Sequence, residues 1–311
     1  MPSTDNKNRV SVVLCTYWPS DFLPAQLQSI ARQTLQPTDV LVSDDSGDRA
    51  VEESIQRQLT EAGLKNTRVI AGPRRGFAAN FLSALMRSDL KGDFFAFCDQ
   101  DDIWLEDKLE AAITRLAQIP PDTPGLYCSR TLLVDEENND IGPSAPCRSA
   151  PSFSNALVQS LAGGNTMVLN REARNLVVAA GQLEVVSHDW WVYMLVSGVG
   201  GQVIFDDTPR LRYRQHQSNV IGSNNSIAGQ MVRVKMLFRN RFKDWNQRNI
   251  SALENARHLL LPENQKQLDK FIAARSGLWF LRVLKLRKSG VYRQTKIGTI
   301  ALFVATIVGK I

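Results

Sequence analysis

Short apolar runs that alternate with helix-like segments are the feature that most constrains how this chain can fold. Each run lacks helical periodicity and is rich in β-branched or aromatic residues, and helical patterns at 23–33 and 77–87 separate members of the series. Strand, helix, strand order predicts parallel pairing, and runs that are apolar throughout predict strands covered on both faces. We therefore predict an open α/β sheet with helices on both sides, built on strands at residues 10–15, 40–43, 67–71 and 94–98.

Polar side chains follow three of these runs directly. They are Thr16 with Tyr17, Asp44 with Asp45, and the cluster from Asp99 to Asp102. Because ligands of such sheets bind beyond the carboxyl ends of the strands, we expect the three groups to converge on one edge. Neighbouring carboxylates are suited to Mg²⁺ or Mn²⁺, which keeps waters and binds phosphate oxygens as well. The alternative is a set of solvated turns, with Asp102 capping the next helix.

The charge of the chain is divided unequally along its length. Residues 1–225 carry 20 basic and 27 acidic side chains, whereas residues 226–311 carry 17 basic and 4 acidic ones. A basic segment of this kind suits an anionic surface, either nucleic acid or the cytoplasmic leaflet of a membrane. Residues 297–309 are uncharged and apolar, too short to span a bilayer but suited to its interface. The alternative is a last helix that packs on the core.

Targeting and cysteine patterns narrow the class of protein. Residues 1–9 are polar, and no later stretch reaches the roughly 20 apolar residues of a membrane span, which predicts a cytoplasmic protein. The four cysteines form no Cys-x-x-Cys pair, which disfavours a zinc site or a disulfide framework. The absence of a glycine-rich phosphate loop from the sequence disfavours P-loop and dinucleotide-binding folds.

Several segments, in the same order and spacing, resemble the family 2 glycosyltransferases, including the bacterial rhamnosyltransferases that extend lipopolysaccharide and other surface polysaccharides. The resemblance covers about residues 10–220 and implies a GT-A fold, Rossmann-like and mostly parallel, for residues 1–225. Residues 226–311 would form a basic helical extension. The segments are 12–17 (VVLCTY), Gln33 with Pro37, 42–46 (VSDDS), 76–81 (GFAANF), 97–108 (FCDQDDIWLEDK), 188–191 (HDWW) and 214–219 (RQHQSN).

The resemblance also implies roles for matched residues. Asp189 would be the catalytic base, although a carboxylate at a helix start is ordinarily a cap or a dipole partner. Asp101 would bind the metal, and His216 would bind the metal or the diphosphate, although a lone histidine is more often structural. Three tryptophans would offer flat faces to sugar rings, or else belong to the core: Trp104, Trp190 and Trp191. The nucleotide sugar would be bound by Thr16, Tyr17, Asp44, Asp45, Gly76, Asn80 and Asp99.

The implied reaction is an inverting transfer from a nucleotide-diphosphate sugar, with dTDP-rhamnose as the favoured donor, to a glycan or glycolipid acceptor. The sequence has no Gln-x-x-Arg-Trp of the processive synthases, which predicts that one or a few sugars are added before release. A sugar nucleotidyltransferase is the alternative enzyme, but it would carry a glycine-rich loop where this chain has residues 16–19. A nucleic-acid-binding protein is the alternative from another class, and the favoured partners include an anionic membrane surface and no nucleic acid.

Overall fold

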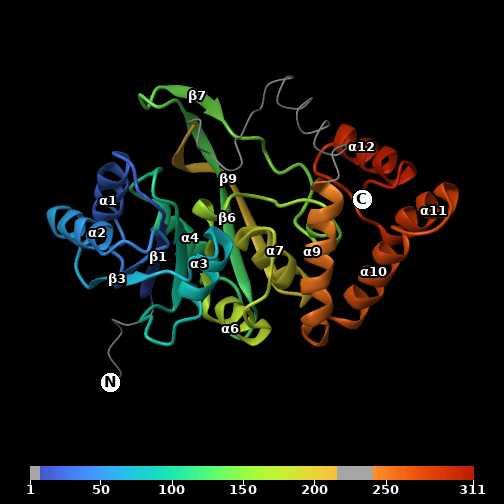
Figure 1. Ribbon diagram of the computed structural model, residues 1–311, viewed down its shortest axis with the longest axis horizontal. Coiled ribbons are helices and arrows are strands. Elements are labelled where there is room, and N and C mark those ends of the chain that lie inside the picture. Colours follow the sequence, from blue (N-terminus) through green and yellow to red (C-terminus); the bar gives the residue numbers. More distant parts are fainter. Residues whose placement is uncertain (1–7, 216–240) are drawn as a thin grey trace.

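The computed structural model describes residues 8–215 and 241–311, and this part of the chain forms one nine-stranded sheet flanked by helices (Figure 1). The strand order is β3-β2-β1-β4-β8-β6-β9-β5, and β7 pairs with β6 at the side of this path. The strands are β1 (Val10–Thr16), β2 (Asp39–Asp44), β3 (Thr67–Ala71), β4 (Phe94–Cys98), β5 (Ile103–Trp104), β6 (Gly125–Val134), β7 (Asp140–Pro143), β8 (Val168–Asn170) and β9 (Gln202–Arg214).

The sheet is mostly parallel, as the sequence predicts. Strand β1 pairs in parallel with both β2 and β4, and β2 pairs in parallel with β3. Strand β8 is antiparallel to β4 and to β6, so β6 and its parallel neighbour β9 run in the same direction as the first four strands. The carboxyl ends of β1, β2 and β4 therefore lie side by side at one edge.

Helices cover both faces of this sheet. Alternate residues of β1 belong to two hydrophobic clusters, with Val12 and Leu14 packed under α1, α2 and α4, and Val13 packed under α3, α6 and α7. The helices are α1 (Leu23–Ala31), α2 (Arg49–Glu61), α3 (Phe77–Leu85), α4 (Lys108–Leu116), α5 (Phe153–Ala156), α6 (Arg171–Ala180), α7 (His188–Gly198), α9 (Arg241–Asn255), α10 (Pro262–Ala273), α11 (Trp279–Ser289) and α12 (Lys296–Ile307), with short 3₁₀ turns at Gly164–Thr166 and Arg257–Leu259.

The carboxyl-terminal helices α9 to α12 form a layer beside α7 (Figure 1). Their buried residues Leu253, Phe271 and Leu302 belong to the same hydrophobic cluster as Phe97 of β4. The prediction of helical structure after residue 227 is thus confirmed from residue 241 onward, and the predicted domain boundary at 225 lies outside the described residues. No helix in the described ranges combines the length and the apolar character needed to cross a bilayer.

Two stretches for which the sequence predicts no strand, β6 and β7, are part of the sheet. Strand β6 pairs with β8 and β9, and its buried Tyr127 donates a hydrogen bond to Asp206 over 2.7 Å. The second stretch is β7: the sequence pattern over residues 135–152 predicts a loop, and the pairing of β7 with β6 corrects that prediction. Strand β7 is almost wholly exposed, and without a buried face it has no apolar alternation from which to predict it.

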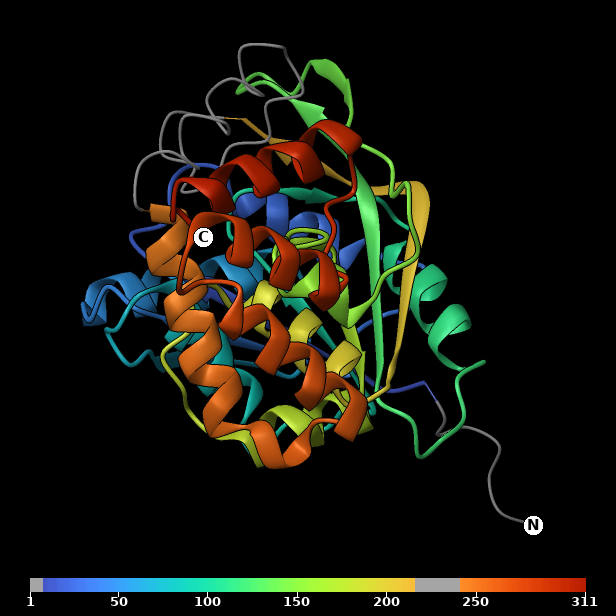
Figure 2. The ribbon, with the colours of Figure 1, turned by 90° about the vertical axis from the view of Figure 1, so that its right-hand side faces the viewer.

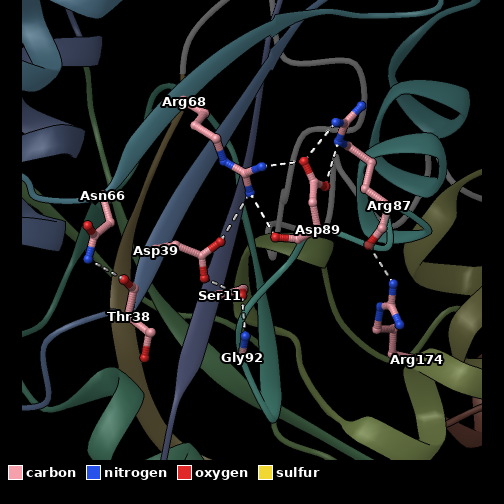
Figure 3. Close-up of polar contacts among 9 residues, drawn as sticks. All are labelled: Ser11, Thr38, Asp39, Asn66, Arg68, Arg87, Asp89, Gly92 and Arg174. Atoms are coloured by element: carbon pink, nitrogen blue, oxygen red, sulfur yellow. Dashed lines mark hydrogen bonds and ion pairs between the residues drawn. The ribbon is translucent and has the colours of Figure 1, made fainter.

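Polar contacts hold the strands in register at the amino-terminal edge of the sheet, opposite the polar clusters (Figure 3). Ser11 of β1 donates to Asp39 of β2 over 2.5 Å and accepts from the backbone N–H of Gly92 over 2.8 Å. Arg68 of β3 contacts Asp39 and pairs with Asp89. The polar side chains that follow β1, β2 and β4 lie at the other, carboxyl edge, which is where ligands of such sheets bind.

Candidate active site

The ends of β1 and β2 are joined by a buried hydrogen bond. Thr16 donates its hydroxyl to Asp44 over 2.7 Å, and the other carboxylate oxygen of Asp44 accepts from the backbone N–H and the hydroxyl of Ser46. Both residues are buried. Thr16 and Asp44 therefore brace the strand ends, and their contact with the nucleoside stays a prediction. Tyr17, by contrast, is 63% exposed beside them.

Asp45 fixes the loop that leads into α3. Its two carboxylate oxygens accept from the backbone N–H groups of Arg74 (2.5 Å) and Gly76 (3.0 Å). Gly76 precedes the first residue of α3 and has a φ of +86°, a conformation that favours glycine. Asp45 is buried and occupied by these bonds, so we assign it to the scaffold, whereas the exposed Gly76 stays a predicted contact to the donor.

Asn80 also belongs to the scaffold. It lies on α3, is buried, and its amide both donates to the carbonyl oxygen of Ser43 over 2.8 Å and accepts from the Ser43 hydroxyl over 2.5 Å. The amide thus ties α3 to β2, and the contact of Asn80 with the nucleotide sugar stays a prediction.

The loop after β4 carries the acidic cluster and is held from two sides. The side chain of Gln100 accepts from the backbone N–H of Tyr17 over 2.9 Å, which joins this loop to the end of β1. Arg214, at the end of β9, donates to the carbonyl oxygens of Asp101 (3.3 Å) and Glu136 (2.6 Å). The expected convergence of the three polar groups on one edge is therefore confirmed.

Asp102 is not a helix cap. It is buried, and its carboxylate accepts hydrogen bonds from the side chain of Asn165 and from the backbone N–H of Arg214. Helix α4 instead begins after Asp107, which makes no capping bond with its side chain. Asp102 thus connects the acidic loop to the 3₁₀ turn at Gly164–Thr166 and to β9, and the alternative in which Asp102 caps the next helix is corrected.

Asp189 faces this edge from the first turn of α7. One of its oxygens, Oδ1, accepts from the Ser187 hydroxyl and from the backbone N–H of Trp190 (2.6 Å), and Oδ2 accepts no bond from any described residue. The preceding His188 is buried and stacks on Phe81 at 4.0 Å between ring centroids, and it packs edge to face with Phe97 at 4.8 Å between centroids. Phe97 is two residues before Asp99, so this stack places the start of α7 against the end of β4.

The electrostatics of the edge show that its carboxylates act on one another. Burial raises the pKa of Asp99 to about 8, with further contributions from the charges of Asp101 and Asp189, while Lys108 opposes them. Burial, followed by the same carboxylates and Asp102, raises the pKa of Tyr213 on β9. Acidic groups that repel one another in a partly desolvated site favour a bound cation.

The donor chemistry of this edge fits a divalent cation of the Mg²⁺ or Mn²⁺ type. Within residues 8–215 and 241–311 no group of three or more His, Cys, Asp or Glu side chains is arranged to hold a metal. Such a cation is, however, commonly held by one or two carboxylates with waters and substrate phosphates completing its shell. Asp101, with Asp99 beside it, meets that requirement. The other predicted ligand, His216, lies outside the described residues.

The three predicted sugar-contacting tryptophans are core residues. Trp104, Trp190 and Trp191 are at most 5% exposed. Lys108 lies 3.6 Å from the centroid of the Trp104 ring, and the Trp190 indole donates to the carbonyl oxygen of Ala156 over 2.6 Å. A buried ring has no face for a sugar, so this prediction is corrected in favour of the core alternative.

Comparison with known proteins identifies the domain that carries this edge. Residues 11–144 match the sequence profile of Glycosyl transferase family 2. This segment of the chain is similar to the family 2 glycosyltransferases. The chain is 24% identical over 253 residues to the dTDP-rhamnosyl transferase RfbG of Shigella flexneri, an alignment that covers 78% of this chain and 84% of that protein.

Solved structures agree with the fold of the glycosyltransferase. The mannosyltransferase PcManGT from Pyrobaculum calidifontis, in complex with GDP-Man and Mn²⁺, superposes with a TM-score of 0.50 at 17% identity, over 97% of this chain and 85% of that one. TarS 1-349 of S. aureus, in complex with UDP-GlcNAc, gives 0.52 at 15% identity, over 97% and 90%. The predicted GT-A fold is therefore confirmed.

Several residues at this edge of the sheet could not be predicted from the sequence. Gln100 and Arg214 fall inside the segments that carry the family resemblance. Their residue types and positions in the sequence do not indicate that they hold the loop after β4 in place. Asn165 and Tyr213 come from distant parts of the chain, and only the pairing of β9 with β5 and β6 brings Tyr213 to this edge.

Proposed function

We propose that this glycosyltransferase moves a sugar from a nucleoside diphosphate donor to a hydroxyl of a lipopolysaccharide core or another surface glycan, with L-rhamnose from dTDP-rhamnose as the donor sugar. The observation that carries the reaction type is the meeting of Asp99, Asp101 and Asp189 at the carboxyl edge of the sheet. The preference for rhamnose rests on the name of the Shigella relative and on the form of the segment 97–108.

In the proposed reaction, Asp189 accepts the proton of the acceptor hydroxyl while that oxygen forms a bond to the anomeric carbon. The bond from this carbon to the diphosphate breaks at the same time, so the configuration inverts and the nucleoside diphosphate leaves. Asp189 is suited to this role because Oδ1 is fixed by Ser187 and Trp190 while Oδ2 has no described partner. General-base assistance of this kind typically contributes about 10² to 10⁴ in rate.

The acidic loop would hold the other half of the reaction. Asp101 and Asp99 would bind the divalent cation, and Tyr17, exposed at the end of β1, would lie beside the nucleoside. The cation, when bound, offsets the negative charge that gathers on the departing diphosphate. Two contacts hold this loop in place. Arg214 of β9 donates to the carbonyl oxygen of Asp101, and Gln100 of the loop accepts from the backbone N–H of Tyr17.

The test is a donor screen with the purified protein, in which release of nucleoside diphosphate is measured for a panel of nucleotide sugars with and without Mn²⁺. We expect dTDP-rhamnose to give the highest turnover and Mn²⁺ to increase it. Asp101→Ala should abolish turnover, whereas the matched control Asp122→Ala, at an exposed carboxylate, should not change it. A faster reaction with another donor would refute the rhamnose assignment, and wild-type turnover in Asp101→Ala would refute the metal role.

A further inference from the structure

Helices α11 and α12 present large apolar side chains to the solvent. We call this surface the C-terminal face and define it by six exposed residues. On α12, Ile297, Ile300 and Val304 recur at helical spacing, with Ile297 67% and Ile300 63% exposed. The remaining three come from α11 and include a tryptophan that is 58% exposed: Trp279, Phe280 and Leu284. Apolar surface gathered in this way, rather than scattered singly, marks an interaction site.

The C-terminal face is a built part of the fold. The opposite sides of the same helices are anchored in the main hydrophobic cluster through Leu286 of α11 and Leu302 and Ala305 of α12. Arg282 of α11 donates to the carbonyl oxygen of Ile307 over 2.7 Å, so the two helices are held side by side at the outside of the molecule (Figure 2). One side of residues 297–309 thus packs on the core, as a last core helix would. The other side stays exposed, as an interface with a membrane would require.

The charge around this face has one sign. Residues 278–311 contain seven basic side chains and no Asp or Glu: Arg282, Lys285, Arg287, Lys288, Arg293, Lys296 and Lys310. Arg287, Lys288 and Lys296 are exposed. An apolar surface bordered by cations is complementary to a lipid surface, whose headgroups are anionic and whose acyl boundary is apolar.

We infer that the C-terminal face docks the enzyme onto an anionic lipid surface, with the aromatic and aliphatic side chains at the acyl boundary and the basic side chains at the headgroups. A second copy of the chain is disfavoured as the occupant, because a symmetric interface would bring two such uniformly basic surfaces together. Nucleic acid is disfavoured because exposed Ile, Leu and Val have no counterpart in a phosphate backbone. This inference stands independently of the proposed donor and acceptor.

Two matched sets of variants separate the apolar and the charged contributions. The charge variant replaces Arg287, Lys288 and Lys296 by Gln, and its control replaces three exposed basic residues at the far side of the sheet and its helices: Arg57, Lys65 and Lys91. The apolar variant is Ile297→Ser with Ile300→Ser. Its control is Ile141→Ser with Val178→Ser, at exposed apolar residues outside the face.

The measurement is sedimentation with vesicles of phosphatidylcholine, with and without phosphatidylglycerol. We expect the full-length protein to bind the anionic vesicles more tightly. Each basic residue near such a surface contributes roughly fivefold, so the charge variant should bind about 100-fold more weakly, while its control stays within a few fold of the wild type. The apolar variant should also lose binding, and its control should not. Thermal unfolding of each variant checks that the fold is intact.

Three outcomes would overturn the inference. One is equal binding of the wild type to vesicles with and without phosphatidylglycerol, and another is an equal loss in a control set and in its test set. The third is a concentration-dependent dimer that the apolar variant abolishes, which would make the C-terminal face a contact between two copies. All three are read without any sugar transfer, so failure here is distinguishable from failure of the proposed reaction.

Discussion

A single methyl group at Gly164 should disable the enzyme by displacing Asp189. A Cβ added to Gly164 would lie 2.1 Å from His188 Nε2, whereas ordinary contacts begin near 3.4 Å, so the imidazole would have to retreat by about 1.3 Å. It is stacked on Phe81 and held at its edge by Phe97, so its retreat would carry the first turn of α7 with it. Displacement of a catalytic group by about 1 Å can lower a rate by about 10²-fold.

The assay for Gly164→Ala is steady-state release of nucleoside diphosphate in the presence of acceptor. We expect kcat to fall by about 10²-fold with little change in KM for the donor, and overpacking to lower the free energy of unfolding by about 1 to 3 kcal/mol. The control is the same substitution in a His188→Ala background, where the clash is absent and the added methyl group should cost almost nothing. An equal loss of rate from Gly164→Ala in both backgrounds would refute this reasoning.

Two further predictions concern the scaffold. Asp45→Ala removes two charge-assisted bonds to the loop before α3, so it should lower the free energy of unfolding by about 3 kcal/mol and raise KM for the donor. Denaturant unfolding and donor titration measure these two effects. An unchanged KM would contradict the prediction. Burial lowers the pKa of His188 to about 4, against the opposing charge of Asp189, while in the unfolded chain it is about 6.5. Between pH 6.5 and pH 4 only the unfolded chain binds this proton, so His188 should reduce stability as the pH falls through that window, by about 3 kcal/mol in total. Denaturant unfolding should show this component of the pH dependence in the wild type and not in His188→Phe, and identical profiles would contradict it.

The predictable part of the fold is the part with a simple burial pattern. Strands β1, β2 and β4 are buried along their whole length, which gives the continuous apolar runs that the sequence reading used. Strand β6 has Ser129 and Thr131 among its buried residues. Buried polar residues interrupt the apolar pattern by which a strand is predicted from sequence. The apolar run at residues 202–205 predicts a short strand, but β9 extends to Arg214 through register shifts that no local pattern records.

For the site, the sequence predicts at which edge of the sheet the polar residues lie. It does not predict which way their side chains point. The rule that ligands bind at the carboxyl edge selected Asp99 and Asp101 together with the strand ends. It does not distinguish a carboxylate that faces a ligand from one that accepts hydrogen bonds from the protein itself, as Asp44 and Asp45 do. Nor does a tryptophan beside a catalytic residue reveal its orientation, and Trp191 proved to be wholly buried.

The most direct test of the account is the turnover of Asp189→Asn at saturating donor and acceptor, measured together with donor affinity. Asparagine keeps an oxygen that can accept from Ser187 and Trp190, so the start of α7 should remain in place. We expect a rate lower by about 10² to 10⁴ with unchanged donor affinity, because only the proton acceptor is lost. Turnover equal to that of the wild type would contradict the assignment of Asp189 as the base that faces the acidic edge of the sheet.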